Sequence, residues 1–277
     1  MKSSLPELPF RIGTTSMVFG KDLLENARNL ARLVDDIQIV LFHTPDLHNI
    51  PGTNEISMLK KISEQENVTF TVHLPASLEI ASPDRTRREA SVKLAREICL
   101  KMEELDPRHY ILHIPFSLPT LVAIPGLYFT TGEKQEWDEW TKRALGSLEI
   151  LHEVFGQADR LLVENINYSP FFLEPLLKKG LYELCLDLGH LILGQENVME
   201  SIKQYLDVTR VIHLHGVKGY EEHLSLSKLP KNRVKEWLRY LIRTSFRGVI
   251  TLEVFSPRDL EESMDVLFET FHLEIRE

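Results

Sequence analysis

The sequence predicts an α/β fold in which eight parallel strands and eight helices form a single (β/α)8 barrel over residues 1–277. Short β-branched or apolar runs alternate with amphipathic segments along the chain, and eight of each can be counted. Strict alternation implies parallel strands, and eight such units close a barrel more readily than they fill an open sheet. A doubly wound sheet is the alternative, but it needs a glycine-rich phosphate loop, and residues 11–16 contain a single glycine.

The eight expected strands are short runs of the kind found in strands that are buried on both faces. In chain order they cover residues 10–15, 36–42, 68–74, 109–114, 160–165, 182–188, 210–216 and 248–254. The segments between them are expected to be helices. The clearest of these have apolar residues at spacings of three and four, over residues 22–33, 86–104, 136–155 and 233–243.

One connection, over residues 115–132 after the fourth strand, is unusually long. It carries several aromatic and aliphatic side chains, among them Phe116, Tyr128 and Phe129. Loops of this length in a compact barrel are usually lids or walls of a binding site. A surface loop packed on its own apolar residues is the other interpretation.

The composition restricts the classes of protein to which the chain can belong. Of its 277 residues, 43% are hydrophobic and 26% are charged, which is typical of a globular protein with one large core. The net charge of -9 argues against a nucleic-acid partner, because such binding depends on neutralising phosphates. No apolar run approaches the roughly 20 residues of a membrane span, and the start lacks the apolar core of a signal peptide, so we expect a cytoplasmic protein without membrane contact.

Residues that bind metals recur at the carboxyl ends of six consecutive expected strands, where the active sites of barrel enzymes lie. They are His73, His113, Glu164, Asp187 with His190 three residues later, His213 with His215, and Glu253. A single residue of this kind is often a helix cap or a histidine bound to the backbone. Six in succession indicate a cation among them, because charged groups in a barrel mouth are costly unless they are paired or bind a metal.

The mixture of ligand types favours certain metals. Imidazole and carboxylate without thiolate suit Zn2+, Mn2+ or Fe2+ better than Mg2+ or Ca2+. The two cysteines, Cys99 and Cys185, lie in apolar stretches and are expected to be core thiols. Glu221 and His223 add a further candidate pair, because residues two apart in an extended loop can point the same way.

With these residues in place, the chain resembles the xylose isomerase-like TIM-barrel superfamily, which includes sugar isomerases, epimerases and abasic-site nucleases of the endonuclease IV type. The resemblance to the nuclease branch implies a cluster of two or three divalent ions. Its nine implied ligands are His73, His113, Glu164, Asp187, His190, His213, Glu221, His223 and Glu253. Glu221 stands where the pattern of that branch has Asp, which lengthens one ligand arm.

A narrower resemblance concerns residues 10–16, 34–42, 71–75, 213–217 and 223–226, which are similar to the cobamide remodeling phosphodiesterase family. Membership would imply a metal-dependent hydrolase that acts on a small-molecule substrate, a cobamide. The implied reaction cleaves the phosphodiester of the nucleotide loop and releases cobinamide and an α-ribazole phosphate, so that the lower base can be exchanged.

This chemistry would assign catalytic roles to two carboxylates. Glu164 is expected to bridge two ions, with zinc the expected metal, beneath an attacking hydroxide, and Glu253 to be a ligand and a proton acceptor. Four carboxylates and a hydroxide carry five negative charges. Three divalent ions therefore leave a net positive charge for the phosphodiester, whereas two leave a negative one.

Loops after the first, fifth and seventh strands are expected to meet polar groups of the substrate. The candidates are Thr14, Thr15, Ser16, Asn165, Asn167 and Lys218, while Phe116, Tyr128 and Phe129 are candidates for packing on the corrin or the lower base. Each could equally be an ordinary loop residue. His43 and His215 are left without an assigned role.

Two other enzyme classes fit part of the pattern. A sugar isomerase or epimerase needs one metal, held by Glu164, Asp187, His213 and Glu253, and leaves the other histidines without a function. An abasic-site endonuclease shares the whole cluster, but the acidic composition and the apolar fourth loop favour a bulky small molecule over duplex DNA. A barrel that only binds a ligand would not need a complete set of metal ligands.

Overall fold

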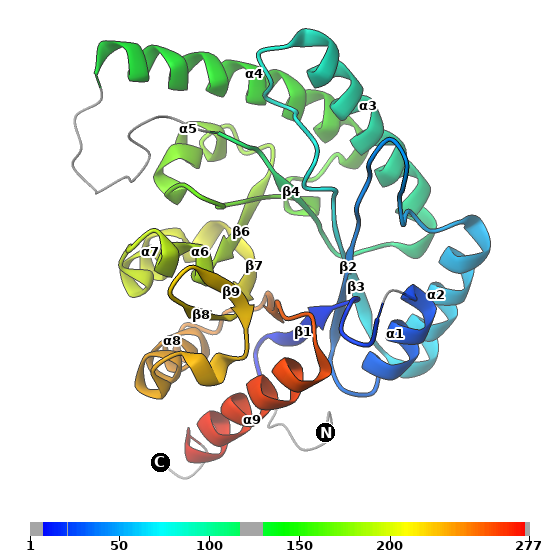
Figure 1. Cartoon of the computed structure of the whole chain (residues 1–277), viewed down its shortest axis with the longest axis vertical. Coiled ribbons are helices and arrows are strands. Elements are labelled where there is room, and N and C mark those ends of the chain that lie inside the picture. The colour runs from blue at the N-terminus through cyan, green and yellow to red at the C-terminus, as the bar shows by residue number, and fades with distance from the viewer. Residues whose placement is uncertain (1–7, 21, 117–129, 275–277) are drawn as a thin grey trace.

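Eight parallel strands close into a barrel in the computed structural model, which describes residues 8–20, 22–116 and 130–274 (Figure 1). The strands are β1 Arg11–Thr15, β2 Asp36–Val40, β3 Thr69–His73, β4 Tyr110–His113, β5 Leu161–Glu164, β6 Glu183–Asp187, β7 Thr209–Leu214 and β10 Val249–Leu252. Around the barrel their order is β1, β10, β7, β6, β5, β4, β3 and β2, and β2 pairs again with β1. The predicted (β/α)8 barrel is confirmed.

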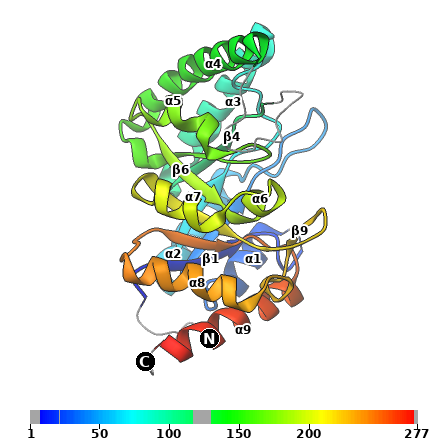
Figure 2. The ribbon, with the colours of Figure 1, turned by 90° about the vertical axis from the view of Figure 1, so that its left-hand side faces the viewer.

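Helices cover the outside of the barrel (Figures 1 and 2). They are α1 Leu23–Leu30, α2 Thr53–Glu66, α3 Arg85–Met102, α4 Thr131–Phe155, α5 Glu174–Leu177, α6 Leu188–Leu193, α7 Val198–Tyr205, α8 Lys231–Arg243 and α9 Pro257–Glu274. Helix α4 begins earlier than the apolar periodicity predicts. The reason is a capping box at its start, where Thr130 and Glu133 satisfy each other's backbone N–H groups.

A two-stranded antiparallel hairpin follows β7 where the sequence predicted only a loop. Its strands are β8 Gly216–Lys218 and β9 Glu221–Leu224, and Gly219 in the turn between them has a φ of +64°. Strand β9 is exposed or half-buried along its length and lacks the apolar alternation that identifies a strand in a sequence. The hairpin brings His223 to the end of the barrel at which the predicted ligands lie.

The register of the parallel strands places predicted ligands side by side. His113 on β4 is the pairing partner of Glu164 on β5, and Asp187 on β6 is the partner of His213 on β7. Beneath these side chains one part of the barrel interior is apolar and consists of Ile111, Leu162, Cys185, Val211 and Val249. The β10, β2 and β3 strands contribute the buried polar residues Thr251, Gln38 and Thr71 instead.

The larger hydrophobic core lies outside this interior, where buried side chains of the strands and the surrounding helices pack together. Cys99 and Cys185 are free and buried, in agreement with the expectation of core thiols. Among the helices of the described ranges, none combines the length and the apolar character needed to cross a membrane.

Candidate metal centre

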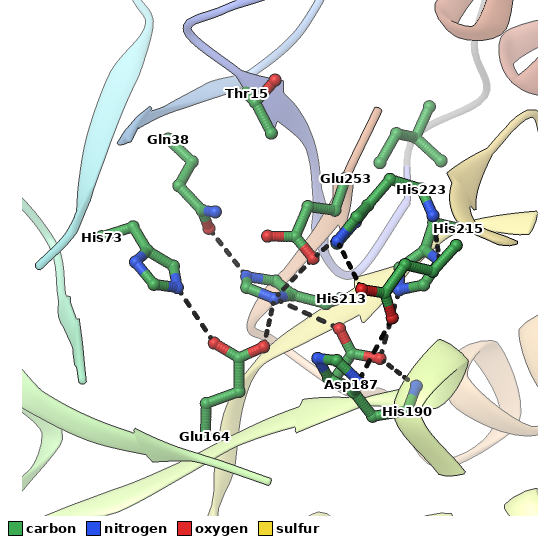
Figure 3. A network of polar contacts seen from close by, with 12 residues as sticks. Thr15, Gln38, His73, Glu164, Asp187, His190, His213, His215, His223 and Glu253 are labelled. Carbon is green, nitrogen blue, oxygen red and sulfur yellow. Dashed lines mark hydrogen bonds and ion pairs between the residues drawn. The ribbon is translucent and has the colours of Figure 1, made fainter. Parts of the chain in front are cut away.

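The predicted ligands other than Glu221 converge at the carboxyl end of the barrel, and most of them are labelled in Figure 3. Among the described residues, four groups have ligand atoms that all lie within 4.8 Å of one another. One of them, which we call the central position, consists of Glu164, Asp187, His213 and Glu253, and another, the β3–β4 position, consists of His73, His113 and Glu164. The remaining two join Cys185 to Glu164 and His213, and His215 to His223 and Glu253. Because Glu164 belongs to both the central and the β3–β4 positions, one carboxylate joins these two positions.

Three carboxylates surround one imidazole nitrogen at the central position. The Nδ1 atom of His213 lies 3.0 Å from Glu164 Oε1, 3.2 Å from Glu253 Oε2 and 3.6 Å from Asp187 Oδ2. His213 and Asp187 are completely buried, and Glu253 is 6% exposed. Three carboxylates so close together in a dry environment repel one another unless a positive charge lies among them.

Gln38 determines which nitrogen of His213 faces these carboxylates. The Oε1 atom of Gln38 lies 2.8 Å from His213 Nε2, and because an amide oxygen can only accept, Nε2 carries the hydrogen and donates it. Nδ1 therefore faces the three carboxylates. Because their negative charges outweigh burial and raise the pKa of His213 well above its usual value, Nδ1 carries a second proton when no metal is bound, and a cation would take the place of that proton.

The β3–β4 position has the same character. His73 Nδ1 donates to the carbonyl of Leu74 at 2.8 Å, which leaves the Nε2 lone pair of the neutral ring facing inward. That Nε2 atom lies 3.1 Å from Glu164 Oε2 and 3.2 Å from His113 Nε2. His113 Nε2 in turn lies 3.0 Å from Glu164 Oε2. Nitrogen and oxygen ligands therefore face one another here as well.

A third group lies beside the β8–β9 hairpin, and we call it the hairpin position. Here Glu222 lies between two imidazoles, with its Oε2 atom 3.6 Å from His190 Nδ1 and its Oε1 atom 3.7 Å from His223 Nε2. The sequence predicted Glu221 in this role. Both glutamates are exposed, but of the two only Glu222 forms ion pairs with these imidazoles among the described residues, while Glu221 is the β-ladder partner of Lys218. The prediction assumed an extended backbone, whereas His223 has a φ of +56°, so that the alternation of side chains breaks between residues 221 and 223.

Electrostatic interactions within the cluster shift the ionisation of its members. Burial alone would raise the pKa of Glu164, but His213 and His113 outweigh it and hold that pKa well below its usual range. Burial would likewise raise the pKa of Asp187, and His215 and His190 lower it. Burial would lower the pKa of His213, whereas the surrounding negative charges raise it well above its usual value. The carboxylates are therefore ionised at neutral pH.

Several atoms of the cluster lack a hydrogen-bond partner among the described residues. They are Asp187 Oδ2, Glu253 Oε2, His215 Nε2 and His223 Nδ1, and all four are buried atoms. Unpartnered buried polar atoms are costly unless something else binds them. Imidazole nitrogens and carboxylate oxygens are the ligands that divalent transition metals prefer, so the residues present fit such an ion.

Three of the predicted substrate-binding residues have structural partners instead. The hydroxyls of Thr14 and Thr15 donate to the carbonyls of Leu252 and Val254 and join β1 to the end of β10. The side chain of Asn165 forms two hydrogen bonds with the backbone of Asp187, at 2.8 and 3.0 Å. All three predicted residues are completely buried, which is not compatible with direct contact to a substrate.

The other predicted substrate contacts are distributed differently. Lys218 is exposed in the β8–β9 hairpin, and Asn167 is exposed after β5. Phe116 is buried against Trp140, with ring centroids 4.7 Å apart, and belongs to an aromatic cluster of the core. Tyr128 and Phe129 lie outside the described residues, as does most of the 115–132 connection. His43 pairs with His48 in the loop after β2 and does not join the cluster.

Sequence reasoning missed two residues of the centre. Gln38 could have been noticed as a polar residue inside the apolar run of β2, but its partner on β7 is far away in the sequence. Glu222 could not be distinguished from Glu221, because the choice depends on the backbone conformation of His223. Ser16, also a candidate, accepts a hydrogen bond from the Val40 N–H and is buried.

Comparison with known proteins places this centre in a familiar fold. Residues 27–270 match the family model of the xylose isomerase-like TIM barrel. The chain is similar to the crystal structure of a D-tagatose 3-epimerase-like protein, with 21% identity, a TM-score of 0.75, and coverage of 95% of this chain and 98% of that chain. No curated protein sequence matches significantly.

Two further solved structures have the same fold. A 3-keto-D-glucoside 4-epimerase from E. coli in its apo form is 15% identical, with a TM-score of 0.69 and coverage of 94% of this chain and 98% of that chain. A xylose isomerase domain protein from Planctomyces limnophilus is 15% identical, with a TM-score of 0.67 and coverage of 96% and 97%. At these identities the structures demonstrate the fold alone, whereas the family model covers most of the chain. The chain therefore belongs to the xylose isomerase-like TIM barrel family.

Proposed function

We propose that the protein is a metal-dependent phosphodiesterase that hydrolyses the nucleotide-loop phosphodiester of a cobamide. The observation that carries the proposal is the pair of histidine groups on either side of the central position. A centre with one metal would use only the central position and would leave His73, His113, His190 and His223 without a function. The resemblance of the sequence to the cobamide remodeling phosphodiesterase family supplies the choice of substrate.

Hydrolysis of a phosphodiester requires a strong nucleophile at neutral pH and positive charge near the phosphoryl oxygens. Bound divalent ions supply both, by lowering the pKa of a water molecule and by neutralising negative charge. Glu164 would hold ions at both the central and the β3–β4 positions, because each of its oxygens faces one of them. Glu253, the most accessible carboxylate of the central position, is the candidate proton acceptor.

The charges of the cluster favour more than one ion. Glu164, Asp187, Glu222 and Glu253 carry four negative charges, and a hydroxide nucleophile adds a fifth. Three divalent ions make the centre weakly positive, which favours binding of a phosphodiester monoanion. The central position alone, with one ion, would remain negative and repel it.

Exposed apolar side chains around the mouth of the barrel support a large, partly apolar substrate. Phe171 in the short helix Pro170–Leu173 after β5, Tyr220 in the turn of the β8–β9 hairpin and Phe255 after β10 are 46%, 99% and 41% exposed. The ring of Phe255 lies 5.2 Å from that of His223, edge to face, so a substrate at the hairpin position would touch it. Aromatic surfaces of this kind suit the corrin or the lower base.

The test is incubation of the metal-loaded protein with a cobamide, an abasic DNA duplex and a panel of ketoses, with analysis of the products. We expect cobinamide and an α-ribazole phosphate from the cobamide. The His73→Ala and His223→Ala variants should lose metal and at least about 100-fold of the turnover. If both variants keep full metal content and turnover, the multi-metal centre is wrong.

A sugar epimerase is the second candidate, and one observation favours it. The four residues of the central position suffice to hold one metal, and two of the similar structures named above are described as an epimerase and an epimerase-like protein. In that case a ketose should exchange a carbon-bound proton with deuterated solvent, and the cobamide should remain intact. If the His73→Ala and His223→Ala variants still catalyse this proton exchange, the protein is a sugar epimerase.

A further inference from the structure

His215 lies beside the metal centre, but neither of the candidate reactions gives it a role. It is completely buried, and its ring lies between the β8–β9 hairpin and the turn that leads from β6 into α6 (Figure 3). The ring centroids of His215 and His223 are 4.5 Å apart. His215 therefore contacts two segments that carry metal-facing side chains.

The hydrogen bonds of His215 fix the position of its proton. The backbone N–H of His223 donates to His215 Nδ1 at 3.0 Å, so Nδ1 is the unprotonated nitrogen. The carbonyl of Gly216 lies 3.3 Å from the same atom, but two acceptors cannot hydrogen-bond to each other. The hydrogen of the neutral ring is therefore on Nε2, which lies 3.4 Å from Asp187 Oδ1, within ion-pair distance but without a hydrogen bond among the described residues.

The two residues that His215 contacts, Asp187 and His223, each direct another side-chain atom toward the metal centre. Asp187 Oδ1 accepts from the His190 N–H at 2.6 Å and faces His215, which leaves Oδ2 directed at the central position. His223 has a φ of +56°, a backbone conformation that residues other than glycine rarely adopt. The hydrogen bond to His215 holds this conformation, in which His223 Nδ1 lies 3.5 Å from Glu253 Oε2.

The turn after β6 is adapted to the His215 ring. A Cβ atom at Gly189 would lie between 2.0 and 2.6 Å from three atoms of the imidazole. Real Cβ atoms do not come so close to other atoms, so no larger residue fits at 189 while the ring is in place. The glycine is required by the ring and not by its own backbone, because it lies inside α6.

We propose that His215 is a positioning residue that holds the β8–β9 hairpin against Asp187, so that His223 and Asp187 present their free atoms to metal. The inference rests on the metal centre of the proposed function and not on the identity of the substrate. Without His215, the hairpin keeps its covalent connection to β7 but loses the contact that directs His223. The hairpin position should then lose its ion first.

The first experiment measures amide hydrogen exchange and metal content in three variants. His215→Ala should accelerate exchange of the His223 amide by at least about 10-fold and lower metal content by about one ion per chain. His215→Asn keeps an acceptor near Nδ1 and should restore slow exchange. His215→Gln places its amide near Nε2 and should retain the contact with Asp187 while the His223 amide exchanges quickly.

The second experiment uses the packing of Gly189. Gly189→Ala should lower the melting temperature and the metal content, because the new methyl group displaces the ring. In a chain that already carries His215→Ala, Gly189→Ala should lower the melting temperature and the metal content much less, since the ring is no longer there to be displaced. His109→Asn is the matched control: it alters another buried histidine, outside the cluster, and should leave metal content and His223 exchange unchanged.

The outcomes separate this inference from the proposed function. If His215→Ala loses metal while exchange of the His223 amide is unchanged, His215 is itself a ligand and the inference is wrong. Additive effects of Gly189→Ala and His215→Ala would also overturn it. If the wild-type protein binds no metal at all, the proposed function fails, but the exchange and the double-variant measurements still decide the role of His215.

Discussion

The Nε2 atom of His213 lies 2.8 Å from the Oε1 atom of Gln38, and both side chains are completely buried. Of the described contacts, this one directs Nδ1 of His213 toward the carboxylates of the central position, where it can bind a metal once its proton is displaced. Gln38→Leu should therefore weaken metal binding by about 10- to 100-fold. Competition with a chelator of known affinity measures this change.

Gln38→Glu is the control for that prediction. A carboxylate at position 38 still accepts from Nε2, so metal affinity should stay close to that of the wild-type protein. Equal losses in the Leu and Glu variants would show that Gln38 acts through packing and not through the hydrogen bond.

Removal of the metal should destabilise the fold. Glu164, Asp187 and Glu253 are buried and converge on His213, so they repel one another once the cation is gone. We expect a chelator to lower the melting temperature by several degrees, and readdition of metal to restore it. An unchanged melting curve, together with substoichiometric metal in the untreated protein, contradicts the metal centre.

His109 should make the protein less stable in mild acid. Burial disfavours its charged form and lowers its pKa from 6.5 to about 4, despite the hydrogen bond to the Asp159 carbonyl. The unfolded chain therefore binds the proton more tightly, and the free energy of unfolding falls as the pH drops from about 6.5 to about 4, by about 3 kcal/mol. Urea unfolding across this range should show a smaller loss for His109→Asn, and parallel curves would refute the assignment.

Asp36 should have the opposite effect to His109 and make the protein more stable in mild acid. Burial raises its pKa from 3.8 to about 6, although Thr69 donates a hydrogen bond to it at 2.6 Å. The folded chain binds this proton more tightly, so the free energy of unfolding rises as the pH falls from about 6 to about 4. Asp36→Asn should remove this rise and stabilise the protein at pH 8 by up to about 3 kcal/mol.

The exposed residue Asp46 provides the control for Asp36. Asp46→Asn should leave the pH dependence of unfolding as it is in the wild-type protein. If it changes the curve as much as Asp36→Asn does, net charge and not burial is the cause.

Removal of the Phe255 or Tyr220 ring should weaken the binding of a large substrate more than that of a small one. Both rings are exposed at the mouth of the barrel, and Phe255 contacts His223. With a cobamide, Phe255→Ala should raise KM by about 10-fold, equivalent to about 1.4 kcal/mol. With bis(p-nitrophenyl) phosphate, KM should change little. A similar loss with both substrates would instead indicate damage to the metal centre.

The fold could be predicted because each strand–helix unit is encoded locally. The alternation of buried runs and amphipathic segments identified all eight barrel strands, and their carboxyl ends located the ligands. The hairpin of β8 and β9 could not be predicted, because a partly exposed ribbon has no apolar periodicity. For the same reason Glu221 was chosen where the structure has Glu222.

Substrate contacts were harder to predict than metal ligands. Histidines and carboxylates at the ends of six consecutive strands indicate a metal together, whereas a single threonine hydroxyl can bind a ligand or a backbone carbonyl equally well. Thr14, Thr15 and Asn165 have the second kind of partner, and only tertiary structure shows it. Phe116, predicted to contact the substrate, likewise belongs to the aromatic core, where Trp140 packs against it.

The hydroxyl of Thr14 joins β1 to β10 across 238 residues of sequence. Contacts between such distant segments form late, because a long loop of chain must close before they can be made. The ligands of the central position come from β5, β6, β7 and the end of β10, which are consecutive in the barrel, whereas Gln38, which orients His213, lies on β2 beyond this seam. A partly folded chain with an open seam therefore has the four ligands but lacks the contact that orients His213. Tight metal binding should consequently accompany the last step of folding, and a refolding experiment that follows metal and secondary structure together would see the helices appear first.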